Sequence, residues 1–68
     1  MNKTAVYGNF ENSVREELKK ALKSGKVKRY RIEKETKVSY HTMNRFIEGD
    51  GMLSGTLDTL GKWLNKNA

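Results

Sequence analysis

Apolar residues recur at helical spacing along most of this chain, and this periodicity constrains the fold more than any other feature. Within each apolar segment the hydrophobic positions lie three or four residues apart, as the buried face of an α-helix requires. A chain of 68 residues with 35% hydrophobic content forms at most one small core. Its low mean hydropathy raises the question of disorder, but the helical period and the absence of Pro argue against it. The sequence therefore predicts one small all-α domain of modest stability.

The first helix is expected to begin at Ser13, where Ser13 and Glu16 form a capping-box pattern, and to end before Gly25. Residues 1–10 show no clear period and are expected to form an irregular arm or a short strand, with residues 11–68 as the domain proper. The residues Val6, Tyr7 and Phe10 would pack from that arm. The inward face of the first helix comprises Val14, Leu18, Ala21 and Leu22.

Two short helices are expected next, over residues 29–36 and 40–48. Ile32 is the main inward residue of the former, which Lys28 caps poorly. Residues 37–39 form a tight connection, and Ser39 is placed to cap the second helix. Met43 and either Phe46 or Ile47 face inward from it.

The last helix is expected to follow Gly49, which closes the helix before it, and to be capped by Ser54. Its apolar stripe comprises Leu57, Leu60 and Leu64, with Leu53 one turn ahead of Leu57 and Trp63 beside the stripe. The expected architecture is thus a compact domain of four helices, with a fifth left open.

Positive charge is concentrated in one part of the chain. The formal net charge is +6, and nine of the fourteen Lys and Arg residues fall between Lys19 and Lys37, opposed there only by Glu33 and Glu35. A basic face of this kind suits a polyanion, with nucleic acid ahead of an anionic membrane, although a solvated surface is the alternative. No apolar run is long enough to span a bilayer, and with no Cys the chain is expected to be soluble and cytoplasmic.

The sequence offers no catalytic or metal-binding set. His41 is the only His, and no Cys is present, so one chain cannot build a multi-histidine or thiolate metal site. Each Ser has a capping or loop explanation. We therefore expect no enzyme, no cofactor and no small-molecule ligand.

Two short helices joined by about three residues match the helix-turn-helix unit, whose second helix enters the major groove of DNA. The outer face of that second helix must carry side chains that bond to base edges. Asn pairs with adenine and Arg with guanine in this setting. The expected base-contacting residues are Tyr40, His41, Asn44 and Arg45.

From Lys26 to Leu64 the chain resembles the phage repressor and Cro-like helix-turn-helix family. The markers are Val38-Ser39, Thr42, Arg45-Phe46, Gly49 and the Leu-rich end from Leu53 to Leu64. The resemblance implies a lambda-repressor-like domain that binds double-stranded DNA. It implies phosphate contacts from the start of the second helix and its neighbours, at Lys26, Lys28, Arg29, Arg31 and Ser39, which position the protein without reading sequence.

The chain departs from the family pattern at two positions. Glu33 stands where the family usually has a small residue, so its carboxylate must swing outward to avoid crowding the next helix. Lys37 stands at the turn where the family has Gly and must adopt a positive φ, at a cost near 1 kcal/mol. An ion pair between Glu33 and Lys37 would offset about 0.2–0.5 kcal/mol of that cost.

These features together predict a sequence-specific DNA-binding transcription regulator, acting at the nucleoid of a bacterial host cell. One such module buries little surface, so a homodimer on a palindromic operator is expected. The main alternative is a protein-binding module on the same scaffold, such as an antitoxin, with an apolar patch around Met52 and Trp63. A binder of structured RNA and a membrane-surface helix are further alternatives.

Overall fold

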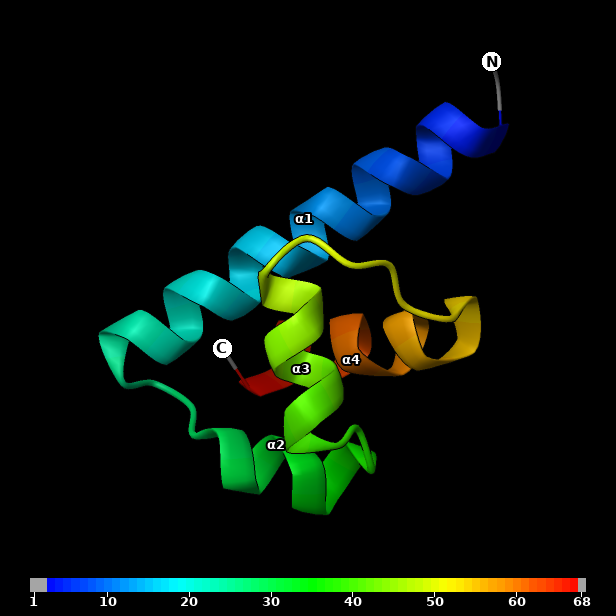
Figure 1. The fold of residues 1–68 in the computed structure, drawn as a ribbon. Coiled ribbons are helices and arrows are strands. Elements are labelled where there is room, and N and C mark those ends of the chain that lie inside the picture. Colours follow the sequence, from blue (N-terminus) through cyan, green and yellow to red (C-terminus); the bar gives the residue numbers. More distant parts are fainter. Residues whose placement is uncertain (1–2, 68) are drawn as a thin grey trace.

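The computed structural model describes residues 3–67, with side chains described from residue 9 onward. Four helices follow one another along the chain (Figure 1): α1 (Lys3–Ser24), α2 (Arg29–Thr36), α3 (Tyr40–Ile47) and α4 (Ser54–Asn67). No strand and no fifth helix occurs within this described range. The prediction of a compact all-α domain of four helices is confirmed.

The first helix is longer than the sequence predicted. α1 is already helical from Lys3, so the expectation of an irregular arm or short strand is wrong for residues 3–10. Residues 1–2 and the side chains of Val6 and Tyr7 lie outside what the structure describes. Ser13 consequently lies inside α1 and caps nothing. A single Gly8 costs a helix only about 1 kcal/mol, and no Pro interrupts this stretch.

Phe10 gives the N-terminal part of α1 a contact with α4. Its ring lies over Gly61, where an added Cβ would come within 3.4 Å of Phe10 Cζ and 3.3 Å of Val14 Cγ2. Because Gly61 has no side chain, α1 and α4 approach each other closely at this point. The apolar stripe of α1 therefore starts one turn before the residue from which the sequence predicted it.

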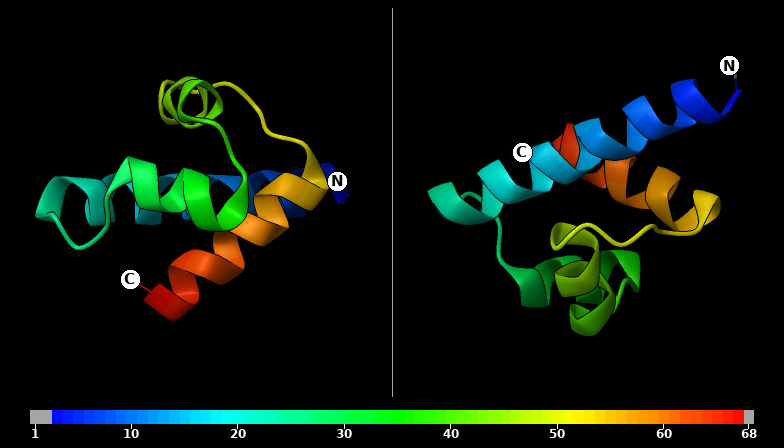
Figure 2. Two further views of the ribbon diagram at one scale, coloured as in Figure 1. Left: turned by 90° about the horizontal axis from the view of Figure 1, so that it is seen from below. Right: turned by 45° about the horizontal axis from the view of Figure 1, so that its top comes forward.

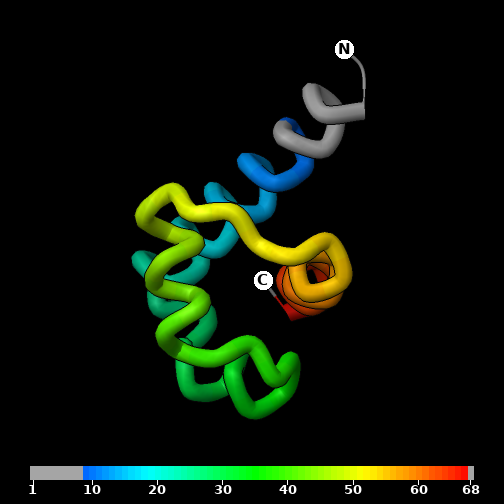
Figure 3. The backbone as a smooth tube through the Cα atoms, turned by 45° about the vertical axis from the view of Figure 1, so that its right-hand side comes forward, coloured from blue at the N-terminus to red at the C-terminus, as the bar shows by residue number. Residues whose placement is uncertain are grey.

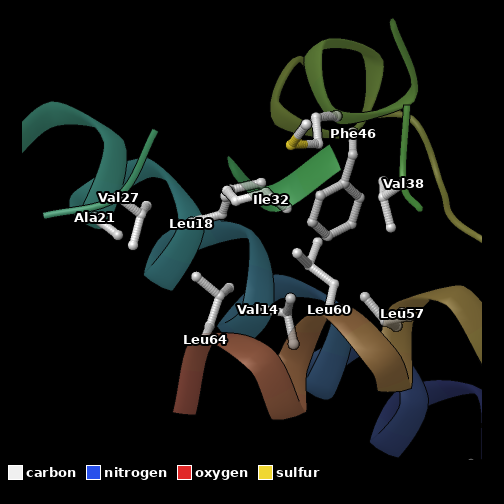
Figure 4. Packing of buried hydrophobic residues seen from close by; sticks show 11 residues of the cluster. Val14, Leu18, Ala21, Val27, Ile32, Val38, Phe46, Leu57, Leu60 and Leu64 are labelled. Atoms are coloured by element: carbon white, nitrogen blue, oxygen red, sulfur yellow. The ribbon is translucent and has the colours of Figure 1, made fainter. Parts of the chain in front are cut away.

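The core comprises residues from all four helices and from the turns between them (Figure 4). The Phe46 ring of α3 points toward Leu60 of α4, with Ile32 and Val38 on either side. The buried residues are Val14, Leu18, Ala21, Val27, Ile32, Val38, Met43, Phe46, Leu57, Leu60 and Leu64. The inward faces predicted for the four helices are confirmed, with Leu22, Ile47 and Trp63 partly buried against this cluster.

Leu53 and Ser54 depart from the prediction for the last helix. Leu53 is 80% exposed and takes no part in the apolar stripe. Ser54 is the first residue of α4, and the carbonyl of Leu53 accepts a hydrogen bond from Leu57 N at 2.8 Å. The helix therefore begins one residue too early for Ser54 to cap it, and Leu53 occupies the flanking position outside the core.

The turn between α2 and α3 follows the predicted chemistry. Lys37 adopts the left-handed conformation, with φ 67°, and its N–H donates to Glu33 O at 2.9 Å. Ser39 Oγ accepts from Thr42 N at 3.1 Å and so caps α3. The Glu33 side chain is exposed and does not crowd α3, and no Glu33–Lys37 ion pair forms between these described side chains. The positive φ of Lys37 is therefore stabilised by backbone bonding, without the side-chain pair.

α3 lies on the outside of the molecule. Seen end-on in the left panel of Figure 2, it lies on the opposite side of α1 and α2 from the C-terminal end of α4. The tube in Figure 3 shows α2 and α3 together to one side of α4. α3 contacts α1 and α2, which leaves its other side uncovered. None of the described helices has the length and apolar character needed to cross a membrane.

Candidate nucleic-acid interface

The uncovered side of α3 is a polar stripe. His41, Arg45 and Glu48 are exposed and spaced four and three residues apart, opposite the buried Met43 and Phe46. Two of the predicted base-contacting residues, His41 and Arg45, are therefore in the centre of this side. Glu48 was not predicted and adds an acidic group to the same stripe. The stripe is thus of mixed charge, although the chain as a whole is strongly basic.

The other two predicted base-contacting residues are joined to α2 by Arg29. The Arg29 Nε–H donates to Asn44 Oδ1 at 3.0 Å, and the Arg29 guanidinium lies 5.6 Å from the centroid of the Tyr40 ring. Arg29, predicted as a phosphate contact, therefore orients two side chains of α3. Because its carbonyl oxygen accepts from Arg29, the Asn44 amide directs its NH₂ group, a donor, away from α2.

Arg45 is bonded to a residue in the loop after α3. Its Nε–H donates to Asp50 Oδ2 at 2.8 Å, in an ion pair whose side chains are 62% and 53% exposed. The sequence predicted only a loop for residues 49–51 and did not identify Asp50 as part of the site. The sequence signal that could have identified Asp50 is an acidic residue five positions after Arg45, just beyond Gly49. In the structure Gly49 has a φ of 120° and closes the helix.

Asp50 is held in place from α1 by Arg15. Arg15 Nη2 donates to Asp50 O at 2.9 Å, and Arg15 Nε donates to Phe46 O at 2.6 Å. The guanidinium also stacks on the Phe46 ring, 4.5 Å from its centroid. One turn earlier in α1, Glu11 Oε2 accepts from Met52 N at 3.1 Å. α1 thereby fixes both the C-terminal end of α3 and the loop that carries Asp50.

The predicted phosphate-contacting residues do not all share one place. Lys26 and Lys28 are exposed in the segment between α1 and α2, beside the partly buried Arg29. The hydroxyl of Ser39 caps α3 and bonds Thr42 Oγ1 at 2.9 Å. Lys37, exposed at the turn, is a further cation near α3 that was not among the predicted contacts.

Arg31 lies apart from this group, on the side of α2 that faces α4. Its Nε donates to Glu35 Oε2 at 3.1 Å, its Nη2 to Asn67 Oδ1 at 3.2 Å, and its guanidinium lies 5.5 Å from the Trp63 ring centroid. Arg29 and Arg31 are two residues apart on a helix and so point in nearly opposite directions. The structure therefore places Arg31 in the contact between α2 and α4.

Trp63 belongs to the same contact. Its indole N–H donates to Glu35 Oε1 at 2.7 Å, and this bond, with a smaller contribution from Arg31, lowers the pKa of Glu35 below its ordinary value. With its N–H bonded and a guanidinium over its ring, Trp63 is not part of an open apolar patch. This speaks against the patch around Met52 and Trp63 on which the protein-binding alternative depended.

The described residues include no group of three or more His, Cys, Asp or Glu side chains that could hold a metal ion. Comparison with known proteins found no family model, no curated protein and no solved structure that matches this chain. The functional interpretation therefore rests on the geometry of α2, the turn and α3.

Proposed function

We propose that this chain is a sequence-specific regulator that binds double-stranded DNA and reads the major groove with α3. The observation that carries this proposal is the uncovered polar side of α3 next to the three-residue turn from α2. An α-helix fits the major groove of B-DNA, and Asn and Arg side chains on its outer face reach base edges. His41, Asn44 and Arg45 are the proposed base contacts, with Tyr40 beside them.

Exposed cations beside α3 support the same orientation on DNA. Lys26 and Lys28 precede α2, and Lys37 lies in the turn before α3, so exposed positive charge stands at both ends of the helix that precedes the proposed reading helix. Contacts of these ammonium groups with phosphates would fix the register of the helix without reading sequence. The proposal includes a lambda-repressor-like arrangement on DNA, a homodimer on a palindromic operator, and a place in the bacterial cytoplasm.

The test is selection of binding sites from a pool of random duplex DNA at about 150 mM salt, with wild type and Arg45→Ala in parallel. We expect an enriched motif in which Arg45→Ala loses preference at one base pair, at a cost of about 1–3 kcal/mol. Lys28→Ala should weaken all duplexes alike and lower the slope of log affinity against log salt by about 1.

Lys62→Ala is the matched control for loss of one positive charge. Lys62 is on α4, with a side chain 78% exposed and paired with Asp58 at 3.2 Å. It should leave the selected motif unchanged. If wild type enriches no motif, the proposed function is wrong. A palindromic motif would support the dimer, whereas a single half-site would argue for binding as a monomer.

A protein-binding module is the second candidate, and the exposure of Leu53 favours it. Leu53 is 80% exposed and lines a shallow groove with Val38, Met52 and Thr56. Contiguous apolar surface marks protein interfaces and a single exposed side chain does not, so this candidate depends on the groove as a whole. If this groove is the functional surface, Leu53→Asp should abolish partner binding, while Arg45→Ala should leave it intact.

A further inference from the structure

The ion pair between Arg45 and Asp50 divides the guanidinium group of Arg45 into two edges. Nε is bonded to Asp50 Oδ2 at 2.8 Å, whereas Nη1 and Nη2 have no hydrogen-bond partner among the described residues. A guanidinium can present two parallel N–H donors along either edge, and the edge that includes Nε is partly occupied here. The outer edge, formed by Nη1 and Nη2, is the one left for a ligand.

Asp50 is itself fixed through its backbone. Its carbonyl accepts from Arg15 Nη2 at 2.9 Å, and its N–H donates to Arg45 O at 3.0 Å. The carboxylate is therefore held at the end of α3 by bonds that do not involve Arg45's side chain. Because the loop is anchored in this way, Asp50 can orient Arg45 without moving toward it.

From this geometry we propose that Asp50 is a positioning residue for sequence reading. It fixes the plane of the Arg45 guanidinium so that Nη1 and Nη2 together donate to O6 and N7 of one guanine. This inference rests on the proposed function and deepens it, because it specifies a G·C pair at the position that Arg45 reads. Only guanine presents two acceptors side by side to such a fork in the major groove.

The same carboxylate lowers affinity for DNA in general. Asp50 and Glu48 put negative charge at the C-terminal end of α3, which repels DNA phosphates, and like charges at an interface mainly affect association and non-specific binding. Asp50 therefore raises the preference for guanine and lowers the affinity for duplex DNA in general. A residue that only stabilised the loop would raise both quantities or lower both.

The test compares Asp50→Ala, Asp50→Asn and Glu48→Gln by competition binding on the selected duplex and on variants of its guanine position. Asp50→Ala should lower the preference for guanine there by roughly 3- to 10-fold and raise affinity for unrelated duplex by roughly 2- to 5-fold. Asp50→Asn keeps an acceptor for Arg45 Nε, so it should gain the same affinity but retain most of the preference. Glu48→Gln should likewise gain affinity for unrelated duplex, because it removes a negative charge from the same end of α3.

Two results would overturn this inference while leaving the proposed function intact. One is a selected motif in which the base read by Arg45 is not guanine. The other is an Asp50→Ala variant whose preference stays within twofold of wild type, with thermal unfolding showing that the variant is folded.

A measurement without DNA tests the ion pair separately. In nitrogen–proton correlation spectra of the free protein, the Arg45 Nε–H signal should be distinct from those of solvated arginines. It should move to the position of a solvated arginine in Asp50→Ala and not in Glu48→Gln. A solvated position in the wild type would refute the inference whatever the outcome of the binding experiments.

Discussion

Replacing Arg15 with alanine removes the side chain that ties α1 to the C-terminal end of α3. The change breaks the bonds to Phe46 O at 2.6 Å and Asp50 O at 2.9 Å, and the stacking of the guanidinium on the Phe46 ring at 4.5 Å. It also breaks the bond to Asn12 Oδ1 at 2.8 Å, which is exposed and contributes little. Both carbonyls lose a charged donor, although Phe46 O keeps its bond from Gly49 N at 3.1 Å.

The size of the effect follows from these contacts. A hydrogen bond from a charged donor contributes about 1.5–3 kcal/mol, and a partly exposed cation–π contact about 0.5–1 kcal/mol. Arg15 is only partly buried, so water replaces some of what is lost, and the net cost should be about 2–3 kcal/mol. A chain of 68 residues has a total stability of roughly 3–10 kcal/mol. The substitution should therefore remove a fifth or more of it, and lower Tm by roughly 8–24 °C.

Urea denaturation followed by far-ultraviolet circular dichroism measures this difference. Arg15→Lys keeps the charge but cannot bridge two carbonyls with a planar fork, so it should fall between wild type and Arg15→Ala. Lys19→Ala is the matched control, because Lys19 is an exposed cation of the same helix with one weak pair to Glu16 at 3.8 Å. If Arg15→Ala lies within about 0.5 kcal/mol of Lys19→Ala, the anchoring argument is refuted.

Three further predictions concern stability. The lowered pKa of Glu35 means that its bond to Trp63 stabilises the fold fully above the ordinary pKa of 4.5, and that this stabilisation is lost as pH falls through the lowered pKa. The difference in Tm between wild type and Glu35→Gln should therefore disappear over that pH range. A difference in Tm that stays constant with pH would contradict this prediction. Gly55→Ala, in open space on α4, should stabilise by about 0.5–1 kcal/mol in thermal unfolding, whereas Gly25→Ala, at φ 82°, should destabilise by about 1 kcal/mol. Lys37→Gly should stabilise by up to about 1 kcal/mol by relieving φ 67°, and a loss in urea denaturation would argue against strain there.

Local patterns in the sequence were sufficient where one helix face or one turn decided the outcome. The buried stripe of Val14, Leu18 and Ala21 and the cap at Ser39 each depend on residues that follow one another at three or four positions, whereas the positive φ of Lys37 was expected from the family resemblance. The start of α1 was mispredicted because a capping box is only a local option. A Ser followed three residues later by a Glu also occurs inside longer helices, as it does at Ser13. In addition, the contact between Phe10 and Gly61 on α4 could not be seen in the sequence.

The site was predictable in its residues but not in its bonds. The spacing of the α2 and α3 segments placed His41 and Arg45 on the exposed side of α3. It could not show that Arg31 turns to Trp63 while Arg29 turns to Asn44, because these choices depend on which helices lie within reach of each side chain. Asp50 was overlooked for the same reason: its partner Arg45 is close in sequence, but its position is set by Arg15 from α1, 35 residues away.

These bonds bear on how the proposed interface would bind DNA. Ordering a long side chain on binding costs about 0.5–1.5 kcal/mol. Asn44 and Arg45 already have bonded partners in the free protein, and Tyr40 lies against a guanidinium, so part of that cost is met during folding. His41, at the N-terminal end of the stripe, has no hydrogen-bond partner among the described residues. We therefore expect His41 to adapt to different bases, and the fixed side chains of Tyr40, Asn44 and Arg45 to determine which sequences are rejected.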